Sequence, residues 1–541
     1  MPSADALDRS APPRRFVLAM RNLMYLRNYA STIRELAERG HSVVLFCETE
    51  HGKITEEVRS VADGLFARSE RVQIRPMPGR TGLWAPFAQQ LRVLRDYARY
   101  LDPRLAGSTK CAARAESLLY PPLRDLVKGR DGARAWRRAR LVSAAARRVE
   151  ACLPPAGPSL AALRRERPDA VIVTPLVDFN SDQVDLIKAA RALGLPCALA
   201  VASWDNLTNK GLIQVLPDRL LVWNEAQRDE AAQLHGVPAG QVMVTGAQLF
   251  DHWFERQPSR DRATFCRQVG LDPARPFILY TCSSVFIARQ EAGFVARWLE
   301  RLRSHPDPLL REAGVLIRPH PGSAKYAAQW QVPEIAGRDN VAVFPKAGGY
   351  PVVESAQADY YDSLYHAAAV FGINTSALLE AGIVGRPTFT LLAPEFAESQ
   401  EAMVHFKHLT RDGFLHVADD FEGHLEALRR SLAEGPEQDG RIARFVAGFL
   451  RPHGLDRPAT PLVAEACESL AQLGPARSRP PLAAPLVRLA LLPAALWLYF
   501  VGSGRNTKKW GPKNRPLARI KTWVAIQLGW VERSESGRRG A

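Results

Sequence analysis

The stretch Ala369–Pro387, AVFGINTSALLEAGIVGRP, indicates most clearly how this chain folds. Its first residues are apolar and predict a buried strand that ends at Gly372. The polar triplet Asn374–Ser376 predicts the cap of a following helix, and the sequence Gly385-Arg386-Pro387 predicts the end of that helix. A strand that passes through a short polar turn into a helix is the repeating unit of α/β proteins.

The same turn has the chemistry of a nucleotide site. The free amides and the hydroxyls of Thr375 and Ser376 at a helix start suit a phosphate, and Asn374 precedes them. Glu380 follows Ser376 by four residues and therefore lies on the same helix face, where its carboxylate can accept hydrogen bonds from a ribose. An ordinary Ser/Thr cap with a helix-stabilising acid fits the same residues.

Strands and helices alternate on both sides of this stretch. The first series predicts a strand at Phe16–Met20, a helix at Tyr29–Arg39 and a strand at Ser42–Cys47, and this order opens a parallel sheet. A second series begins with the strand Phe277–Thr281, after a proline-containing boundary at 256–276. The sequence therefore predicts two Rossmann-like, doubly wound α/β domains that face each other across a cleft.

We divide the chain accordingly into four parts. They are a disordered lead at 1–13, a first Rossmann-like domain at 14–258 with a basic helical insertion at 80–150, a second Rossmann-like domain at 276–460, and a helical, basic-aromatic tail at 461–541.

Positive charge is concentrated in two segments. The 541 residues contain 72 Lys and Arg against 56 Asp and Glu, a formal net charge of +16. Residues 80–150 hold 16 Lys and Arg against 6 acids, and residues 477–541 hold 13 against 2, so the rest of the chain is mildly acidic. This distribution favours two patches that face one anionic surface, and it argues against specific nucleic-acid binding.

The tail suggests where that surface lies. Leu489–Gly504 carries no charge, but its 16 residues fall short of the about 20 that a spanning helix needs, and Pro493 interrupts it. Trp510, Trp523 and Trp530 alternate with basic residues further on, which is typical of a segment that lies in a membrane interface. The same residues are also compatible with a helix packed on the protein body, and a membrane-spanning helix at 481–504 is a further alternative.

Several expectations concern absences. The seven cysteines never form a CxxC pair, and no metal-binding motif is visible, so we expect a reducing compartment, no metal and no cofactor. We expect His405 and His408 to be ordinary surface or core residues. No secretory signal is visible, so we expect a cytoplasmic protein.

Further polar loops follow predicted strands in the second half. Arg318 and His320 are held by prolines and can bind a phosphate or a base edge, and His320 can donate a proton to a leaving phosphate. Ser283 and Ser284 allow a backbone to approach a phosphate closely. A rigid solvent-facing turn and a plain polar loop fit these residues too.

Similar loops occur in the first half. Asp205 is a candidate general base and Lys210 a candidate phosphate ligand, next to Trp204, although a hydrogen-bonded Asx turn explains Asp205 as well. Asp178 has a similar position after a predicted strand. The opening loop at 22–28 adds Tyr25 and Arg27 to the cleft.

Together these segments resemble the GT-B class of glycosyltransferases, through the Asn-Thr-Ser…Glu380-Ala381…Gly385-Arg386-Pro387 segment and the opening Leu36–Val43. Arg318-Pro319-His320-Pro321 with Thr375-Ser376 is similar to a narrower group, the CDP-glycerol glycerophosphotransferases and the capsule sialyl- and Kdo-transferases. Trp204-Asp205-Asn206 departs from the His-Gly turn usual in the glycerophosphotransferases.

The resemblance implies an enzyme with an acceptor-binding first half and a donor-binding second half. The expected activity is transfer of a sugar or polyol phosphate from a nucleotide-activated donor to a surface-polysaccharide or lipid-linked glycan, at the inner face of the cytoplasmic membrane. Alternatives are a sugar-nucleotide epimerase and a non-catalytic membrane-associated scaffold. Implied donor ligands are Ser283, Ser284, Arg318, His320, Asn374, Thr375, Ser376 and Glu380; candidate catalytic groups are Asp205, Asp178 and His320; acceptor-side residues are Tyr25, Arg27, Trp204 and Lys210.

Overall fold

The structure is a computed structural model. It describes residues 12–48, 56, 60, 62–64, 69–127, 132–321, 328–346, 351, 353–411, 414–435, 440–474 and 478–501. Most of the predicted disordered lead, the Lys346–Gly349 loop except its first residue, and the aromatic residues beyond 501 lie outside these residues.

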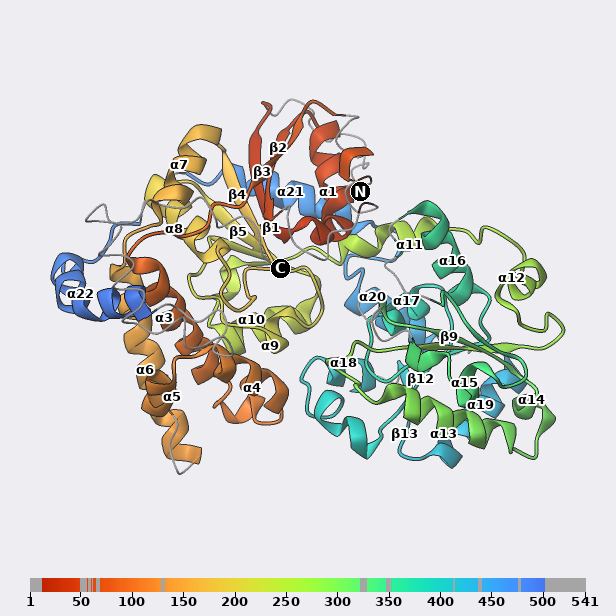
Figure 1. Cartoon of the computed structure of the whole chain (residues 1–541). Helices are drawn as coiled ribbons and strands as arrows, with labels where there is room; N and C mark the ends of the chain where they lie inside the picture. Colours follow the sequence, from red (N-terminus) through yellow and green to blue (C-terminus); the bar gives the residue numbers. More distant parts are fainter. Residues whose placement is uncertain are drawn as a thin grey trace, which may run out of the picture.

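Two α/β lobes lie side by side, each built on one parallel sheet (Figure 1). The first sheet has the order β3-β2-β1-β4-β5-β6-β7, and the second has the order β10-β9-β8-β11-β12-β13. The strands are β1 Arg15–Asn22, β2 Ser42–Glu48, β3 Val72–Pro76, β4 Ala170–Thr174, β5 Cys197–Ala200, β6 Arg219–Val222, β7 Val242–Val244, β8 Phe277–Thr281, β9 Gly314–Arg318, β10 Val341–Val343, β11 Ala369–Phe371, β12 Thr388–Leu391 and β13 Leu415–Ala418.

Strand order reverses at the same point in both sheets. β1 pairs with both β2 and β4, and β8 pairs with both β9 and β11, all in parallel register. In such sheets ligands bind beyond the carboxyl ends of the strands at this switch point. The prediction of two Rossmann-like domains with a GT-B-like arrangement is confirmed.

Helices cover both faces of each sheet. The first lobe contains α1 Leu26–Glu38, α3 Trp84–Arg99, α4 Thr109–Leu118, α5 Pro121–Val127, α6 Gly132–Cys152, α7 Gly157–Glu166, α8 Gln183–Leu193, α9 Asn206–Asn209 and α10 Glu225–His235, with the short turns η1 Leu23–Tyr25, η2 Pro103–Leu105, η3 Ala239–Gln241 and η4 Gln248–Phe250.

The remaining helices connect the lobes and build the second lobe, except that the last two return to the first lobe. They are α11 Asp251–Glu255, α12 Arg262–Val269, α13 Glu291–Arg303, α14 Pro308–Arg311, α15 Pro333–Ala336, α16 Glu354–Tyr365, α17 Ala377–Ile383, η6 Pro394–Ser399, α18 Phe406–Arg411, α19 Phe421–Glu434, α20 Arg441–Phe449, α21 Ala459–Ala471 and α22 Ala484–Val501.

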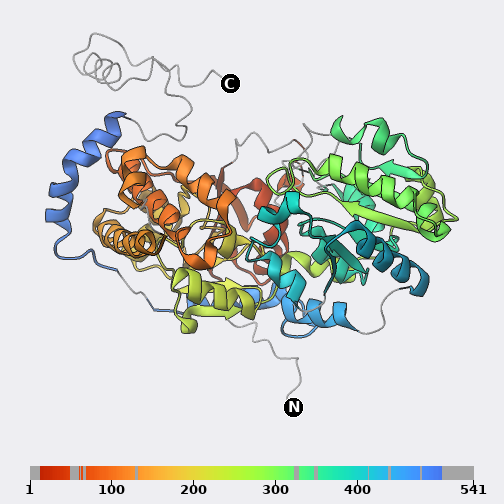
Figure 2. The ribbon, with the colours of Figure 1, turned by 90° about the horizontal axis from the view of Figure 1, so that it is seen from below.

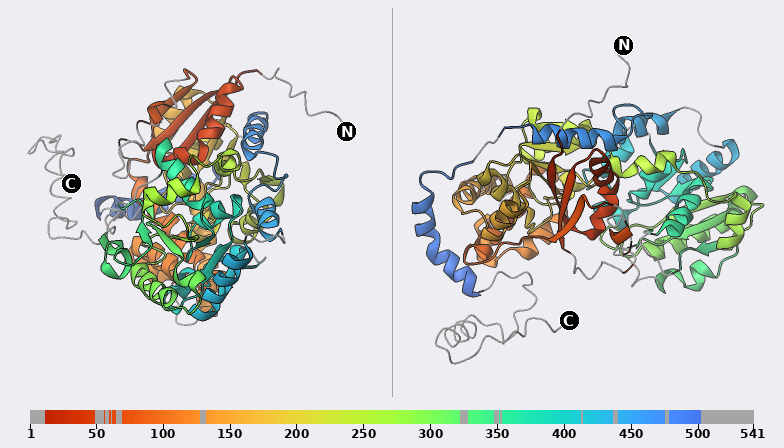
Figure 3. Two further views of the ribbon diagram at one scale, coloured as in Figure 1. Left: turned by 90° about the vertical axis from the view of Figure 1, so that its right-hand side faces the viewer. Right: turned by 90° about the horizontal axis from the view of Figure 1, so that it is seen from above.

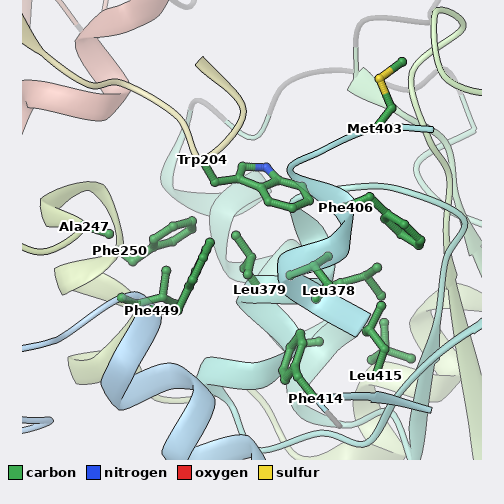
Figure 4. Close-up of a cluster of buried hydrophobic side chains, with 14 of the residues drawn as sticks. Trp204, Ala247, Phe250, Leu378, Leu379, Met403, Phe406, Phe414, Leu415 and Phe449 are labelled. Atoms are coloured by element: carbon green, nitrogen blue, oxygen red, sulfur yellow. The ribbon is translucent and has the colours of Figure 1, made fainter. Parts of the chain in front are cut away.

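One hydrophobic cluster joins the lobes. Trp204 and Phe250 of the first lobe belong to the same buried cluster as Leu378, Leu379 and Phe414 of the second (Figure 4). Because these side chains are removed from water together, the lobes pack directly against each other in addition to being joined by the chain.

The chain returns to the first lobe at its end. Leu450, just after α20, accepts a hydrogen bond from Ala247 N at 2.9 Å, and α21 then packs on α1 with Val463 and Cys467 in the first-lobe core. The two bluish helices of Figure 3 run along one face from the second lobe to the first. Our prediction of a tail from residue 461 differs here, because the apolar stripe of α21 is buried against α1.

α22 lies at the edge of the first lobe, away from the second (Figure 2). It contacts α3 and α6, and Arg488 Nε donates a hydrogen bond to the carbonyl of Cys152 at 2.6 Å. Of the helices among the described residues, none is both long and apolar enough to cross a membrane.

Candidate functional site

A pocket of about 1350 Å³ opens between the lobes. The first lobe contributes α1 with Arg27 and Asn28, together with Trp204 after β5. The second lobe contributes Ser376 and Glu380 at the start of α17, along with Gln357 and Tyr360 of α16 and Glu354 beside them. The pocket therefore lies where the carboxyl ends of both sheets converge, as the strand order requires.

Glu380 is the titratable group that projects from α17 into this pocket. Its Oε2 accepts a hydrogen bond from the hydroxyl of Tyr360. Burial raises the pKa of Glu380 to about 7, against the lowering effects of the Tyr360 hydrogen bond and the charges of Arg27 and Arg318. A carboxyl with such a pKa can both hold and release a proton near neutrality.

Arg318, at the end of β9, lies behind Tyr360. Its guanidinium carbon is 4.6 Å from the centroid of the Tyr360 ring, and its Nη1 donates to Ser363 Oγ at 3.0 Å. Burial lowers the pKa of Arg318 to about 10, so the side chain keeps its charge at neutral pH. No carboxylate of the described residues lies within ion-pair distance of it, so its charge is available to an anion.

Arg27 faces this wall from the first lobe. It is exposed at the start of α1, and its charge acts on Glu380 and Tyr360 across the pocket. We expected a loop at 22–28, but the Asn22 side chain accepts a hydrogen bond from Met24 N at 3.1 Å and starts η1, which continues into α1. Tyr25 and Arg27 are therefore held on helical backbone.

The start of α17 is a weaker anion site than the sequence suggests. The helix has seven residues, so its dipole is small, and Thr375 Oγ1 accepts only a long hydrogen bond, 3.4 Å from Ala377 N. Ser376 is exposed and lines the pocket, whereas Thr375 does not. Arg27, which lines the opposite wall, is better placed to attract an anion, and the charge of Arg318 acts from behind Tyr360.

Ser283 and Asn374 lie next to each other, and they are joined by a hydrogen bond. Asn374 N donates to Ser283 Oγ at 3.3 Å, and Ser283 N donates to both oxygens of Glu291, at 3.0 and 2.9 Å. Both side chains are buried and neither lines the pocket. They hold the turns after β8 and β11 together, which is a structural role.

Ser284 and His320 stand next to these turns. The Ser284 carbonyl accepts hydrogen bonds from Ile287 N and Ala288 N, at 2.8 and 2.9 Å, which closes a turn. His320 is half-buried after β9 and does not line the pocket. Residues 322–327, which follow it, lie outside the described part of the chain.

Asp178 is held between cations in the first lobe. Its carboxylate is 2.8 Å from Arg21 Nη1 and 3.6 Å from Lys210 Nζ, and the Tyr25 hydroxyl is 3.5 Å away. Burial alone would raise the pKa of Asp178, but the charges of Lys210 and Arg21 outweigh it and lower the pKa. A carboxylate fixed in this way is a poor proton acceptor.

Asp205 lies at the lobe interface beside His405, which precedes α18. Burial raises the pKa of Asp205, but the charge of Lys210 outweighs this effect and lowers the pKa. Burial lowers the pKa of His405 to about 4, so this imidazole is neutral. Its Nδ1 is buried without a hydrogen-bond partner, and its ring stacks edge-on at 4.6 Å against Trp204.

Sequence reasoning missed Tyr360, whereas His405 is a buried residue, within the surface-or-core expectation. Tyr360 carries no motif, and only the packing of α16 on α17 brings it to Glu380. The sequence around His405 gives no sign of what its ring interacts with. Asp205, whose charge acts on it, and Asn374, which bonds to it, come from distant segments.

Metal ligation finds no support in the described part of the chain. There, no three His, Cys, Asp or Glu side chains gather in a way that would hold an ion.

Comparison with known proteins supports the fold. No protein-family model and no curated protein sequence matches this chain. A putative UDP-N-acetylglucosamine 2-epimerase from Listeria monocytogenes is similar over 87% of this chain and 99% of its own, with a TM-score of 0.50 and 12% identity. The fold therefore defines a two-lobed, GT-B-like class.

Two other solved structures are similar at lower scores. The UDP-GlcNAc 2-epimerase from Neisseria meningitidis bound to UDP-GlcNAc is similar over 84% of this chain and 100% of its own, with a TM-score of 0.49 and 11% identity. A glycosyltransferase from Rickettsia africae is similar over 85% of this chain and 100% of its own, with a TM-score of 0.48 and 8% identity.

Proposed function

We propose that this chain is an enzyme that transfers a sugar or a polyol phosphate from a nucleotide-activated donor to a surface-polysaccharide or lipid-linked glycan. The observation that carries the proposal is the interlobe pocket. Glu380 and Tyr360 line one wall, with Arg318 behind the Tyr360 ring, and Arg27 and Trp204 line the opposite wall. Two lobes that each supply one wall can bind a donor and an acceptor together.

The donor side has a hydrogen-bond acceptor and two cations. The Glu380 carboxylate accepts hydrogen bonds from ribose hydroxyls, and Arg318 and Arg27 stabilise the negative charge on the phosphates. That charge increases as the nucleotide leaves, so cations fixed beforehand lower the barrier. His320, two residues after β9, does not line the pocket and stays a candidate ligand of the same phosphates from the sequence alone.

On the acceptor side we assign Asp205 as the proton acceptor. The charge of Lys210 lowers the pKa of Asp205 as it does that of Asp178, but Asp205 forms no ion pair in the described part of the chain, whereas Asp178 pairs with Arg21 and Lys210. Removing the proton from the acceptor hydroxyl makes that oxygen a nucleophile as the nucleotide departs.

The donor screen is a thermal-shift measurement with CDP, CMP, UDP and GDP. A ligand that binds only the folded protein raises Tm, and at 100 times Kd the gain is about 2.7 kcal/mol. We expect one nucleotide to raise Tm, and Glu380→Ala to abolish that shift while Glu395→Ala, at an exposed acid far from the pocket, keeps it. If no nucleotide shifts Tm, the proposal is wrong. A cytidine nucleotide would favour the narrower CDP-glycerol and capsule-transferase group.

A sugar-nucleotide epimerase is the second candidate. The near-neutral pKa of Glu380 favours it, because epimerisation requires a group that can move a proton within the pocket. The similar solved structures from Listeria and Neisseria bear that name. Incubation of the bound nucleotide-sugar without acceptor separates the two: NMR detects an inverted sugar centre for an epimerase and an unchanged sugar for a transferase.

We also propose that the protein works at an anionic membrane surface. α22 has an apolar face directed to solvent, with Leu489 68% and Trp497 57% exposed. Its neighbour α6 exposes several arginines. Apolar and basic residues on adjoining elements suit a surface of anionic lipid, where a lipid-linked acceptor would be found.

A further inference from the structure

A second pocket, of about 610 Å³, lies in the helical layer of the first lobe, remote from the interlobe pocket. It is bounded by α3, η2 and α6, with Leu212 and Leu234 from the first-lobe body. Six of the side chains that line it are arginines: Arg95, Arg99, Arg104, Arg137, Arg140 and Arg147.

Two of these arginines are buried without a carboxylate partner. Arg95 is 6% exposed and donates through Nη1 to the backbone and side-chain oxygens of Gln214, at 2.9 and 2.8 Å. Arg99 is 5% exposed and donates to the carbonyls of Lys210 and Gly211, both at 2.8 Å. The Nε atoms of both arginines have no partner, so unused donors remain at this pocket.

The acids nearby do not balance this charge. Asp102 is the acid that lines the pocket, and it pairs with Arg104 at 2.6 Å. Asp96 accepts hydrogen bonds from Leu212 N and Gln214 Nε2, and burial raises its pKa to about 7, so its charge is only partial at neutral pH. The lining thus carries six cations against one anion.

α6 supplies the outer part of the site. Arg137, Arg140 and Arg147 are exposed and lie along one face of the helix. No ion pair joins them to another residue that the structure describes. Burial lowers the pKa of Arg95; the charges of Asp96 and Glu150 oppose this effect, and those of Arg147 and Arg92 add to it.

The walls between the arginines are apolar. Trp136, Leu105, Leu141, Leu212 and Leu234 line the pocket, and the Arg140 guanidinium lies 5.9 Å from the Trp136 ring centroid. Several arginines can bind one phosphate through paired N–H groups, and an anion with two or more charges relieves their repulsion. A volume of 610 Å³ is in the range of sites for small organic ligands and exceeds that of a single ion.

We propose that this pocket binds the phosphate or diphosphate group of a ligand whose remaining part is apolar. Such a group occurs in phospholipid headgroups and lipid-linked phosphates, and it also occurs in free phosphate compounds. The proposal does not rest on the function proposed for the interlobe pocket, because the two pockets share no residue.

The test measures binding to the full chain by isothermal titration calorimetry with two probes, inorganic pyrophosphate and dioctanoyl phosphatidic acid. The test variant is Arg137→Ala/Arg140→Ala, and the control is Arg138→Ala/Arg148→Ala, which removes the same charge from exposed positions of the same helix outside the pocket. We expect the test variant to weaken binding at least tenfold and the control less than threefold. Trp136→Phe should alter the probe-dependent tryptophan fluorescence.

Each outcome decides the proposal. Tighter binding of phosphatidic acid supports a lipid source, and equal binding of both probes supports a free phosphate compound. Binding of pyrophosphate alone overturns the proposal, because the apolar walls would then contact no part of the ligand. Absence of binding for both probes at millimolar concentration overturns the proposal. Equal weakening by the two double variants also overturns it, since the pocket would then be no more than part of a general basic surface. Because all four substituted arginines are exposed, an unchanged Tm verifies that the variants fold.

Discussion

Burial affects the two charged side chains near the second-lobe wall of the interlobe pocket differently. Arg318 has a pKa of about 10, so it still carries a full charge at neutral pH. Glu380 has a pKa of about 7, so about half of these carboxyls are protonated there. The wall therefore becomes less positive as pH rises through neutrality, and Glu380 becomes a better hydrogen-bond acceptor at the same time.

The first prediction concerns the pH dependence of nucleotide binding. Because the Glu380 carboxylate is the form that accepts ribose hydrogen bonds, binding should tighten between pH 6 and pH 8. Glu380→Gln should weaken binding at pH 8 by about tenfold, as expected for a hydrogen bond of about 1.5 kcal/mol, and remove the pH dependence. Calorimetry at several pH values measures both effects.

A second variant checks the cause. Tyr360→Phe removes the hydrogen bond that lowers the Glu380 pKa, so the midpoint of the pH profile should move upward. A midpoint that stays in place in this variant would show that another group titrates.

The second prediction separates Asp178 from Asp205. Asp178→Asn leaves Arg21 and Lys210 without their carboxylate and should cost about 2 kcal/mol of unfolding free energy, a value reduced because both cations are partly exposed. Asp205→Asn should leave KM for the donor nearly unchanged and lower kcat by at least 100-fold, as loss of a general base does. Urea unfolding and steady-state kinetics measure the two effects. The opposite assignment would follow if Asp178→Asn lowered kcat with unchanged stability.

At the residue scale, the sequence predicts which second-lobe residues lie near the pocket better than it predicts what each of them does. Glu380 and Ser376 line the pocket as their helix positions suggested. Ser283 and Asn374 have the right residue types, but they bond to each other, and only tertiary packing decides that. The ring contact of His405 with Trp204 joins residues about 200 positions apart, and local sequence patterns do not reveal such a contact.

Among the elements, apolar runs predicted the parallel strands well, because strands covered on both faces are continuously apolar. β8 and β9 are buried along their whole lengths, for example. Helix starts were less certain, since Asn22 begins a helical turn through a side-chain cap that resembles loop chemistry in sequence. α21 was misassigned, because an amphipathic helix does not indicate which lobe it will cover.

The third prediction tests the turn after β11. A Cβ on Gly372 would lie 2.8 Å from Thr281 Oγ1 and 3.1 Å from the Thr281 carbonyl, on the adjacent strand β8. Gly372→Ala should therefore destabilise the fold by about 1–3 kcal/mol, because backbone on one side cannot move away. Gly448→Ala in α20 is the control: it meets nothing within 4 Å and should be neutral or stabilising by up to about 1 kcal/mol. Urea unfolding compares the two, and equal stability of both variants would contradict the prediction.

At the scale of the whole molecule, the basic helices at residues 80–150 also contact the second lobe. Lys110 of α4 donates to the carbonyl of Ile287 at 3.2 Å and to Ser399 Oγ at 2.5 Å, both in the second lobe. Glu230 of the first lobe meets His408 of the second at 2.6 Å. Lys110 of the basic helices and Glu230 of α10 therefore both link the lobe that holds Asp205 to the lobe that holds Glu380.

The last prediction concerns membrane binding through α22. Ala495 and Leu498 are buried, so one face of α22 packs on the first lobe, while Leu486, Leu489 and Trp497 face solvent on the other. When a helix is apolar on both faces but the protein covers only one, the other face is stabilised by contact with another apolar medium, such as a membrane. Transfer of a leucine side chain out of water stabilises by about 1.5–3 kcal/mol, so replacing Leu489 by a charge should reduce binding to anionic vesicles by at least about tenfold.

Sedimentation with vesicles of phosphatidylcholine and phosphatidylglycerol measures this effect. Leu489→Glu should stay in the supernatant, while Val417→Glu, which adds the same charge at an exposed apolar residue of β13 in the second lobe, should sediment like the unmodified chain. High salt should weaken binding of the unmodified chain, since the arginines of α6 add an electrostatic contribution that ions screen. If both variants sediment equally, α22 is not the membrane contact, and its exposed face must be covered by protein instead.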